Sequence, residues 1–128
     1  MKKILVVDDD DGILEVVQIV LEGEGYLVET CKNGACLQEY AAQSPDLILL
    51  DVLLSGEDGR ELCKKLKQNE LTRHIPIVML SAHSDASKIV DGSGADDFLE
   101  KPFDVDVLIE MVDRYLTFTP ASSTPKNE

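Results

Sequence analysis

The sequence begins MKKILVVDDDDG (residues 1–12), and this stretch sets the expected architecture. An apolar run from Ile4 to Val7 leads directly into four aspartates, Asp8 to Asp11. A strand that is apolar along its whole length is typical of the middle of a parallel sheet, where both faces are covered. Carboxylates crowded at the end of such a strand repel one another. We therefore expect a compensating positive charge close to them.

Strand-like and helical patterns alternate along the rest of the chain. The apolar runs with strand character are 4–8, 26–30, 46–51, 76–80 and 97–101. Four segments have a helical pattern. The first begins with Asp11 as N-cap and stops at Gly23 and Gly25, and the others are 34–42, 59–68 and 105–116. Residues 84–94 have a helical rhythm, but their serine and glycine content favours a short or frayed helix. Strict alternation predicts an α/β fold with a five-stranded parallel sheet, doubly wound as (βα)5 into a three-layer αβα sandwich.

The length and composition indicate one globular domain. We expect residues 1–117 to form it, and residues 118–128, rich in proline, serine and threonine, to be a disordered tail or the start of a linker. The sequence contains no apolar stretch near the ~20 residues that span a bilayer, and its N-terminal apolar run is too short for a signal peptide. These features predict a cytoplasmic protein without a membrane partner.

The charge balance and the cysteines restrict the classes of partner. A net charge of −13 disfavours direct binding of nucleic acid and favours a partner with a basic face or a bound cation. Cys31, Cys36 and Cys63 have neither CxxC nor metal-site spacing. We expect them to be small, reduced and partly buried side chains.

Polar residues are expected to meet at one edge of the sheet, because parallel strands place their carboxyl ends together. Asp8 and Asp9 follow the first strand, Asp51 and Ser81 end the third and fourth, and Lys101 ends the fifth. Two like charges ~4 Å apart cost ~4 kcal/mol at an effective dielectric of about 20, and a divalent cation removes that cost. The pattern predicts a site for Mg²⁺, with Mn²⁺ as an alternative, whereas the spacing of a calcium-binding loop is not met.

Each of these residues also has a purely structural interpretation. An acidic helix N-terminus, favoured by the helix dipole, accounts for Asp10 and Asp11. A strand end for Asp51, a helix cap for Ser81 and a surface position for Lys101 are the corresponding alternatives. Acids from two strands combined with a lysine from a third favour the metal site over these separate explanations.

Four motifs in register carry a resemblance to a known family: VVDDD (6–10), LLDVLLSGEDG (49–59), MLSA (79–82) and FLEKPF (98–103). With them, residues 3–116 resemble the receiver domain of two-component response regulators, of the single-domain, chemotaxis-regulator-like type. The resemblance implies a flavodoxin-like fold and a phosphoacceptor switch. It does not imply an enzyme for outside substrates, since such a domain catalyses only its own phosphorylation and autodephosphorylation.

The resemblance also implies a role for each matching residue. Asp51 would accept a phosphoryl group from a sensor histidine kinase or a histidine phosphotransfer protein, with Lys101 and Ser81 contacting the phosphoryl oxygens. The Mg²⁺ ligands would be Asp9 directly, Asp8 mainly through water, Asp51 itself and the backbone carbonyl of Leu53.

Signalling in the family would involve Ser81 and Phe98 as switch residues, with core packing as the alternative explanation for Phe98. The surface formed by 84–94, strand 97–101 and the last helix would then bind a downstream protein, with a homodimer through this surface as a further candidate. A cis peptide is implied before Pro102.

The sequence departs from the family pattern in three places. Ser55 stands where the family usually has proline, which predicts a more mobile loop, and the stretch from 81 to 101 is slightly short. Leu53 and His83 occupy the two positions that tune loss of the phosphate in the family, and a leucine at position 53 predicts slow loss.

The main alternative function is a non-phosphorylated pseudo-receiver that acts as a docking module. A small aspartyl-phosphate phosphatase would need an acid at position 53, and a flavin binder would need an uncharged phosphate loop after the first strand.

Overall fold

The computed structural model describes residues 2–82 and 92–116. Within these ranges the chain forms a five-stranded, wholly parallel sheet with the strand order β2-β1-β3-β6-β7. Its strands are β1 (Lys3–Val7), β2 (Leu27–Cys31), β3 (Leu47–Asp51), β6 (Ile77–Ser81) and β7 (Asp97–Glu100). The three central strands are the most completely apolar ones, and β3 and β6 are buried along their whole length.

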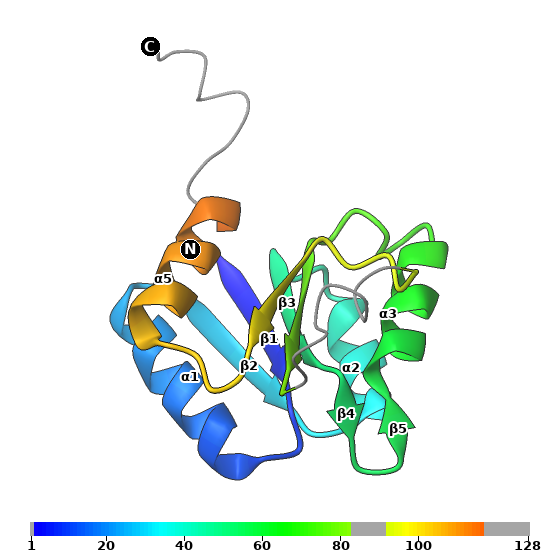
Figure 1. Cartoon of the computed structure of the whole chain (residues 1–128). Helices are drawn as coiled ribbons and strands as arrows, with labels where there is room; N and C mark the ends of the chain where they lie inside the picture. Colours follow the sequence, from blue (N-terminus) through cyan, green and yellow to red (C-terminus); the bar gives the residue numbers. More distant parts are fainter. Residues whose placement is uncertain (1, 83–91, 117–128) are drawn as a thin grey trace.

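Helices cover both faces of the sheet (Figure 1). On one face lie α1 (Asp11–Gly23) and α5 (Val105–Leu116), and on the other lie α2 (Gly34–Ala41) and α3 (Gly59–Gln68). Side chains alternate across a strand, so β1 sends Ile4 and Val6 into the core under α1 and α5, and Leu5 and Val7 into the core under α2 and α3. The predicted three-layer αβα sandwich is confirmed.

The ends of α1 differ slightly from the prediction. The side chain of Asp10, and not that of Asp11, accepts hydrogen bonds from the N–H groups of Gly12 and Ile13, so Asp10 is the N-cap. An N-cap aspartate satisfies donors at the helix start that have no partner inside the helix. The helix then ends at Gly23, as predicted.

The segment after β3 is the largest local departure from the prediction. The sequence predicts a loop around Ser55, yet β4 (Leu53–Leu54) and β5 (Glu57–Asp58) pair as a short antiparallel hairpin. Gly56 stands in its turn with a φ of 75°, a conformation that glycine adopts without steric cost. Figure 1 shows the hairpin beside α2 and α3.

Two predicted segments lie wholly or mostly outside the described residues. These are the tail, 118–128, and most of the weak helix expected over 84–94, of which only 92–94 are described, as a turn. Among the helices within the described ranges, none is both long enough and apolar enough to cross a lipid bilayer.

Candidate functional site

The acidic residues after β1 and at the end of β3 meet where the strand order reverses. The chain runs from β1 outward to β2 and then returns to β3 on the other side of β1, so the carboxyl ends of β1 and β3 flank the reversal. Ligand sites of open α/β sheets occur at such reversals. The carboxylates of Asp8, Asp9 and Asp51 each offer an oxygen, and these oxygens lie within 4.8 Å of one another. The predicted convergence of acids from two strands is present.

Lys101, the residue directly after β7, supplies the compensating positive charge. Its Nζ lies 2.8 Å from Oδ2 of Asp8 and 3.5 Å from Oδ1 of Asp51. The side chain of Asp8 is fully buried, and its other oxygen accepts the N–H of Asp10 at 2.9 Å. Burial lowers the pKa of Lys101, but the hydrogen bond from its Nζ to Asp8 and the charges of Asp51 and Asp8 outweigh this and raise it overall. The lysine therefore stays charged at neutral pH.

Asp51 is a carboxylate in an unfavourable environment. Its side chain is 10% exposed. Burial, followed by the charge of Asp8, raises the pKa of Asp51 from 3.8 to about 6, and Lys101 only partly opposes this. Near neutral pH the ionised form thus carries an electrostatic cost, which a bound cation would remove.

This cost makes a testable prediction for the protein without divalent metal. The folded state binds the Asp51 proton more tightly than the unfolded state, so Asp51 contributes stability below pH 4, and this is lost as the pH rises through about 6. The free energy of unfolding of Asp51→Asn should therefore be about 2 kcal/mol higher than that of wild type at pH 7.5. The difference between the two proteins should shrink towards pH 4. Urea unfolding in EDTA at both pH values measures it, with the exposed Asp106→Asn as the matched control. A variant less stable than wild type at pH 7.5 would contradict this assignment.

Asp9 is held by a contact that sequence reasoning missed. The hydroxyl of Ser55, in the turn of the hairpin, donates a hydrogen bond to Oδ2 of Asp9 at 2.5 Å. This bond is the main reason why the pKa of Asp9 lies below its usual value. The residues are 46 positions apart, so no local pattern indicates the contact. It fixes one carboxylate oxygen of a residue that is expected to bind metal.

The remaining predicted site residues lie around the same edge. The N–H of Leu53 is 3.4 Å from Oδ1 of Asp51, and Leu53 is 58% exposed. Ser81 is buried at the end of β6, and its carbonyl accepts the N–H of Lys101 at 2.7 Å. The Lys101–Pro102 peptide bond is cis, as the resemblance implies. Phe98 is half-buried and packs against the core under α2 and α3, whereas His83 lies outside the described residues.

The donor set fits a hard divalent cation. Three carboxylates with one lysine leave the cluster with excess negative charge, and carboxylate oxygens are the donors that Mg²⁺ prefers. Magnesium also keeps several water ligands and binds phosphate oxygens, so it suits a site made from only a few protein groups. Asp8, Asp9 and Asp51 are the residues whose side chains would hold it. The backbone carbonyl of Leu53 is a further ligand that only the resemblance implies.

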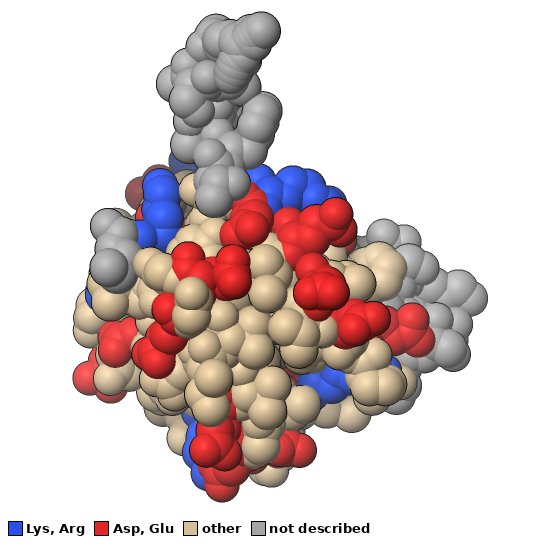
Figure 2. Space-filling view, turned by 90° about the vertical axis from the view of Figure 1, so that its left-hand side faces the viewer, with Lys and Arg blue, Asp and Glu red and all other residues tan. Residues whose placement is uncertain are grey.

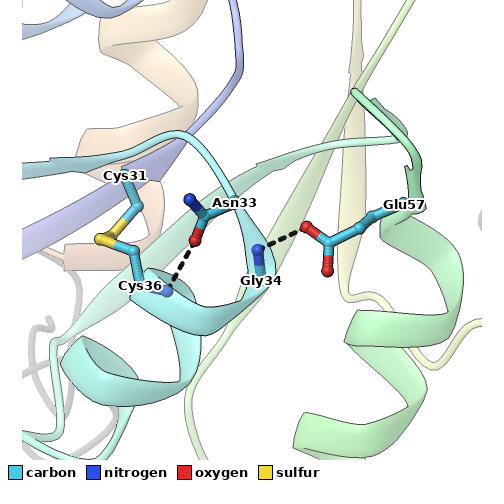
Figure 3. The surroundings of a disulfide bond; sticks show 5 residues. All are labelled: Cys31, Asn33, Gly34, Cys36 and Glu57. Atoms are coloured by element: carbon cyan, nitrogen blue, oxygen red, sulfur yellow. Dashed lines mark hydrogen bonds between the residues drawn. A yellow bond between two sulfur atoms is a disulfide. The ribbon is translucent and has the colours of Figure 1, made fainter.

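The prediction for the cysteines is wrong in two of three cases. Cys31 and Cys36 form a disulfide between the end of β2 and the first turn of α2 (Figure 3), and only Cys63 is a free, buried thiol. The Cα atoms of Cys31 and Cys36 are 5.6 Å apart because the chain turns directly from the strand into the helix. A five-residue spacing across a strand–helix junction was the available signal, but it matches no common disulfide motif.

Comparison with known proteins agrees with this geometry. Residues 4–113 match the sequence profile of the response regulator receiver domain. The chain is 43% identical over 115 residues to the DNA-binding dual master transcriptional regulator RpaA of Synechocystis, covering 88% of this chain and 48% of RpaA. It is 41% identical over 133 residues to the alkaline phosphatase synthesis transcriptional regulatory protein PhoP of Bacillus subtilis, covering 99% of this chain and 55% of PhoP.

A solved structure extends the likeness from sequence to shape. The chemotaxis protein CheY4 of Vibrio cholerae superposes with a TM-score of 0.83 at 30% identity, covering 91% of this chain and 99% of CheY4. The chain thus spans about half the length of the two transcriptional regulators but nearly all of this solved chain. From the profile match and these likenesses, we conclude that the chain belongs to the response regulator receiver domain family.

Proposed function

We propose that this chain is a phosphoacceptor switch in which Asp51 receives a phosphoryl group in a Mg²⁺-dependent reaction. The observation that carries the proposal is the cluster itself: three carboxylates within 4.8 Å at the carboxyl edge, with Lys101 between Asp8 and Asp51. The donor would be the phosphohistidine of a sensor histidine kinase or of a histidine phosphotransfer protein. Asp51 would attack phosphorus, a P–O bond would form as the P–N bond breaks, and the imidazole would leave.

The roles of the protein groups follow from their charges. A bound Mg²⁺ would supply positive charge against the phosphoryl oxygens and would offset the burial and the repulsion from Asp8 that together raise the pKa of Asp51. Lys101 is already within 3.5 Å of Asp51 Oδ1 and can follow the new oxygens without a large movement. The reaction needs positioning and charge balance more than acid–base chemistry. We therefore regard the chain as a switch that acts chemically only on itself, and not as an enzyme for other substrates.

The switching proposal concerns Ser81 and Phe98. Phosphorylation adds charge and acceptor oxygens to Asp51. The Ser81 hydroxyl, at the end of the strand next to β3, would turn towards them, and Phe98 would follow into the space that opens. This would bias the surface that includes β7 and α5 towards binding a downstream protein, or a second copy of the chain.

The surface charge suits protein partners. Acidic side chains are prominent on the face that carries α1 and α5 (Figure 2), and the net charge of the chain is −13. Such a surface repels phosphate backbones, so the DNA binding named for RpaA is not proposed for these residues. A cytoplasmic location, where the kinase would be met, remains our prediction.

Phosphorylation by acetyl phosphate tests the function. Wild type, Asp51→Asn and Asp106→Asn are incubated with acetyl phosphate and Mg²⁺, and intact mass is recorded. We expect one phosphoryl adduct on wild type and on Asp106→Asn, no adduct on Asp51→Asn, and no adduct on any protein when EDTA replaces Mg²⁺. An adduct on Asp51→Asn would place the modification elsewhere, and no adduct on wild type would favour the pseudo-receiver alternative.

The lifetime of the phosphorylated form provides a separate prediction. The exposed Leu53 side chain stands beside Asp51 and cannot orient an attacking water. One added hydrogen bond to that water is worth about 1 kcal/mol, or roughly fivefold in rate. Leu53→Asn should therefore lose phosphate several-fold faster than wild type, as followed by intact mass after removal of acetyl phosphate. Leu71→Asn, another exposed leucine, should decay like wild type, and equal decay of all three proteins would remove the idea.

A further inference from the structure

The disulfide lies in a segment that is bonded to the acidic site. Cys31 ends β2, and its carbonyl accepts the backbone N–H of Asp8 at 3.0 Å. Five residues later, Cys36 lies in the first turn of α2, where its N–H donates to the side chain of the N-cap Asn33 at 2.9 Å. The bridge therefore ties the strand end that holds the backbone of Asp8 to the start of the next helix (Figure 3).

The same segment is bonded to the hairpin on its other side. The N–H of Gly34 donates to Oε1 of Glu57 at 2.7 Å (Figure 3). A Cβ on Gly34 would lie 2.5 Å from the other oxygen of Glu57, so the approach is close. Glu57 pairs with Leu54 across the hairpin, and the turn between them carries Ser55, which holds Asp9. Two of the three carboxylates are thus connected to the bridged segment.

The two sulfur atoms differ in accessibility. Cys31 is 2% exposed, whereas Cys36 is only partly buried. An incoming thiolate can therefore reach Cys36 more readily than Cys31. In the second step of the exchange Cys36 is the leaving group, and its position at a helix N-terminus favours this step because the helix dipole stabilises a thiolate. Burial raises the pKa of Cys63 to about 11, so this third cysteine remains a protonated thiol and does not compete in the exchange.

We propose that the Cys31–Cys36 bond is a thiol–disulfide exchange site for a dithiol reductant, and that its reduction weakens Mg²⁺ binding by the carboxylates. The second part rests on the proposed function of those carboxylates. A disulfide in a protein of the predicted compartment is usually transient and redox-sensing, which agrees with an exchange role. Opening the bridge frees the segment that positions Asp8 and, through Glu57 and the hairpin, Asp9.

The exchange balances in two steps. A thiolate of the reductant attacks Sγ of Cys36, a new S–S bond forms, and Cys31 leaves as a thiolate that takes up a proton. The second thiol of the reductant then attacks the reductant's first sulfur atom, which is bonded to Cys36 in the mixed disulfide. Cys36 leaves as a thiolate and is protonated. The dithiol is oxidised to a cyclic or internal disulfide by two electrons, and the protein gains two thiols.

Thiol counting tests the site itself. The chain is prepared oxidised or after treatment with dithiothreitol, then unfolded and alkylated with iodoacetamide, and intact mass is recorded. Because Cys63 is the one free cysteine of three, we expect one alkyl group on the oxidised form and three on the reduced form. Three groups on a chain kept under oxidising conditions, or one group after dithiothreitol acts on the folded protein, would overturn the exchange site.

Calorimetric titration with Mg²⁺ tests the coupling. We expect the Kd for Mg²⁺ to rise about fivefold on reduction of wild type. A fivefold change in affinity is at the lower end of the coupling between two sites in a protein. The comparison needs no variant, because it uses one protein in two redox states. Cys36→Ser should bind like the reduced wild type and should not respond to dithiothreitol, whereas Cys63→Ser should respond like wild type.

The outcomes separate this inference from the proposed function. Equal Kd values for the two redox states of wild type would overturn the coupling and leave the phosphoacceptor proposal standing. An absence of Mg²⁺ binding in both states would overturn the coupling and the proposed metal site together. A response to dithiothreitol that persists in Cys36→Ser would assign the effect to another group.

Discussion

Gly59→Ala is expected to lower the free energy of unfolding by about 3 kcal/mol or more. A Cβ on Gly59 would overlap the backbone carbonyl oxygen of Asp51 and would lie 3.0 Å from the carbonyl oxygen of Val52. Both obstacles are backbone atoms, which cannot turn away as a side chain can. Gly59 also donates its N–H to Val52 at 2.7 Å and begins α3, so moving it breaks a hydrogen bond and shifts a helix. The strain would fall on Asp51, the proposed phosphoacceptor.

Gly23→Ala is the matched control for this substitution. Gly23 is the last residue of α1, and an added Cβ there has no atom within 4 Å. Alanine is the better helix former, so this variant should be as stable as wild type or slightly more stable. Urea unfolding followed by far-UV circular dichroism measures both. If Gly59→Ala proved as stable as Gly23→Ala, the close approach of Gly59 to Asp51 would be wrong.

Most of the sheet could be predicted because its strands carry simple patterns. The run Ile4 to Val7 is apolar at every position, and the structure uses alternate residues of it for the two cores. The same reasoning applies to β3 and β6, which are buried throughout. The parallel direction of the strands follows from their alternation with helices and from right-handed crossovers, whereas the strand order is known from the structure. The N-cap of α1 was predicted one residue too late, at Asp11 and not at Asp10, because two adjacent aspartates are equally good caps by residue type.

The positions of Asp8, Asp9, Asp51 and Lys101 could be predicted from the strand ends alone. Each is placed by backbone topology, so a correct sheet brings them together without knowledge of side-chain packing. The resemblance adds chemical roles to these positions. Physical reasoning from the sequence had already predicted a site of excess negative charge balanced by one lysine.

The hairpin, the Ser55–Asp9 contact and the disulfide could not be predicted in the same way. The paired segments Leu53–Leu54 and Glu57–Asp58 are two residues each, too short for any alternation of apolar and polar residues to be recognised. The Ser55–Asp9 contact depends on that hairpin. The disulfide depends on how closely β2 runs into α2, which sequence spacing alone does not define.

Lys101→Met should be the most damaging single change to the charge balance of the site. Methionine keeps much of the apolar stem of lysine but removes the charge that lies 2.8 Å from the fully buried Asp8. Removing one partner of a buried ion pair leaves an uncompensated charge in a medium of low dielectric. We expect the free energy of unfolding at pH 7.5, in EDTA, to fall by about 3 kcal/mol. Urea unfolding of the variant and of wild type measures this loss.

A measurement at lower pH and a control variant in an exposed ion pair distinguish this loss of stability from a packing defect. Lys101 lowers the pKa of Asp51, so that pKa is higher still without the lysine. The variant therefore gains stability relative to wild type as the pH falls and Asp51 becomes protonated. The control Lys64→Met removes a lysine 3.3 Å from Glu61 in an exposed pair and should cost less than about 0.5 kcal/mol at any pH. If Lys101→Met lost the same stability at pH 5 as at pH 7.5, packing would account for the effect. The acidic cluster would then not be under the electrostatic strain from which a role for a cation was inferred.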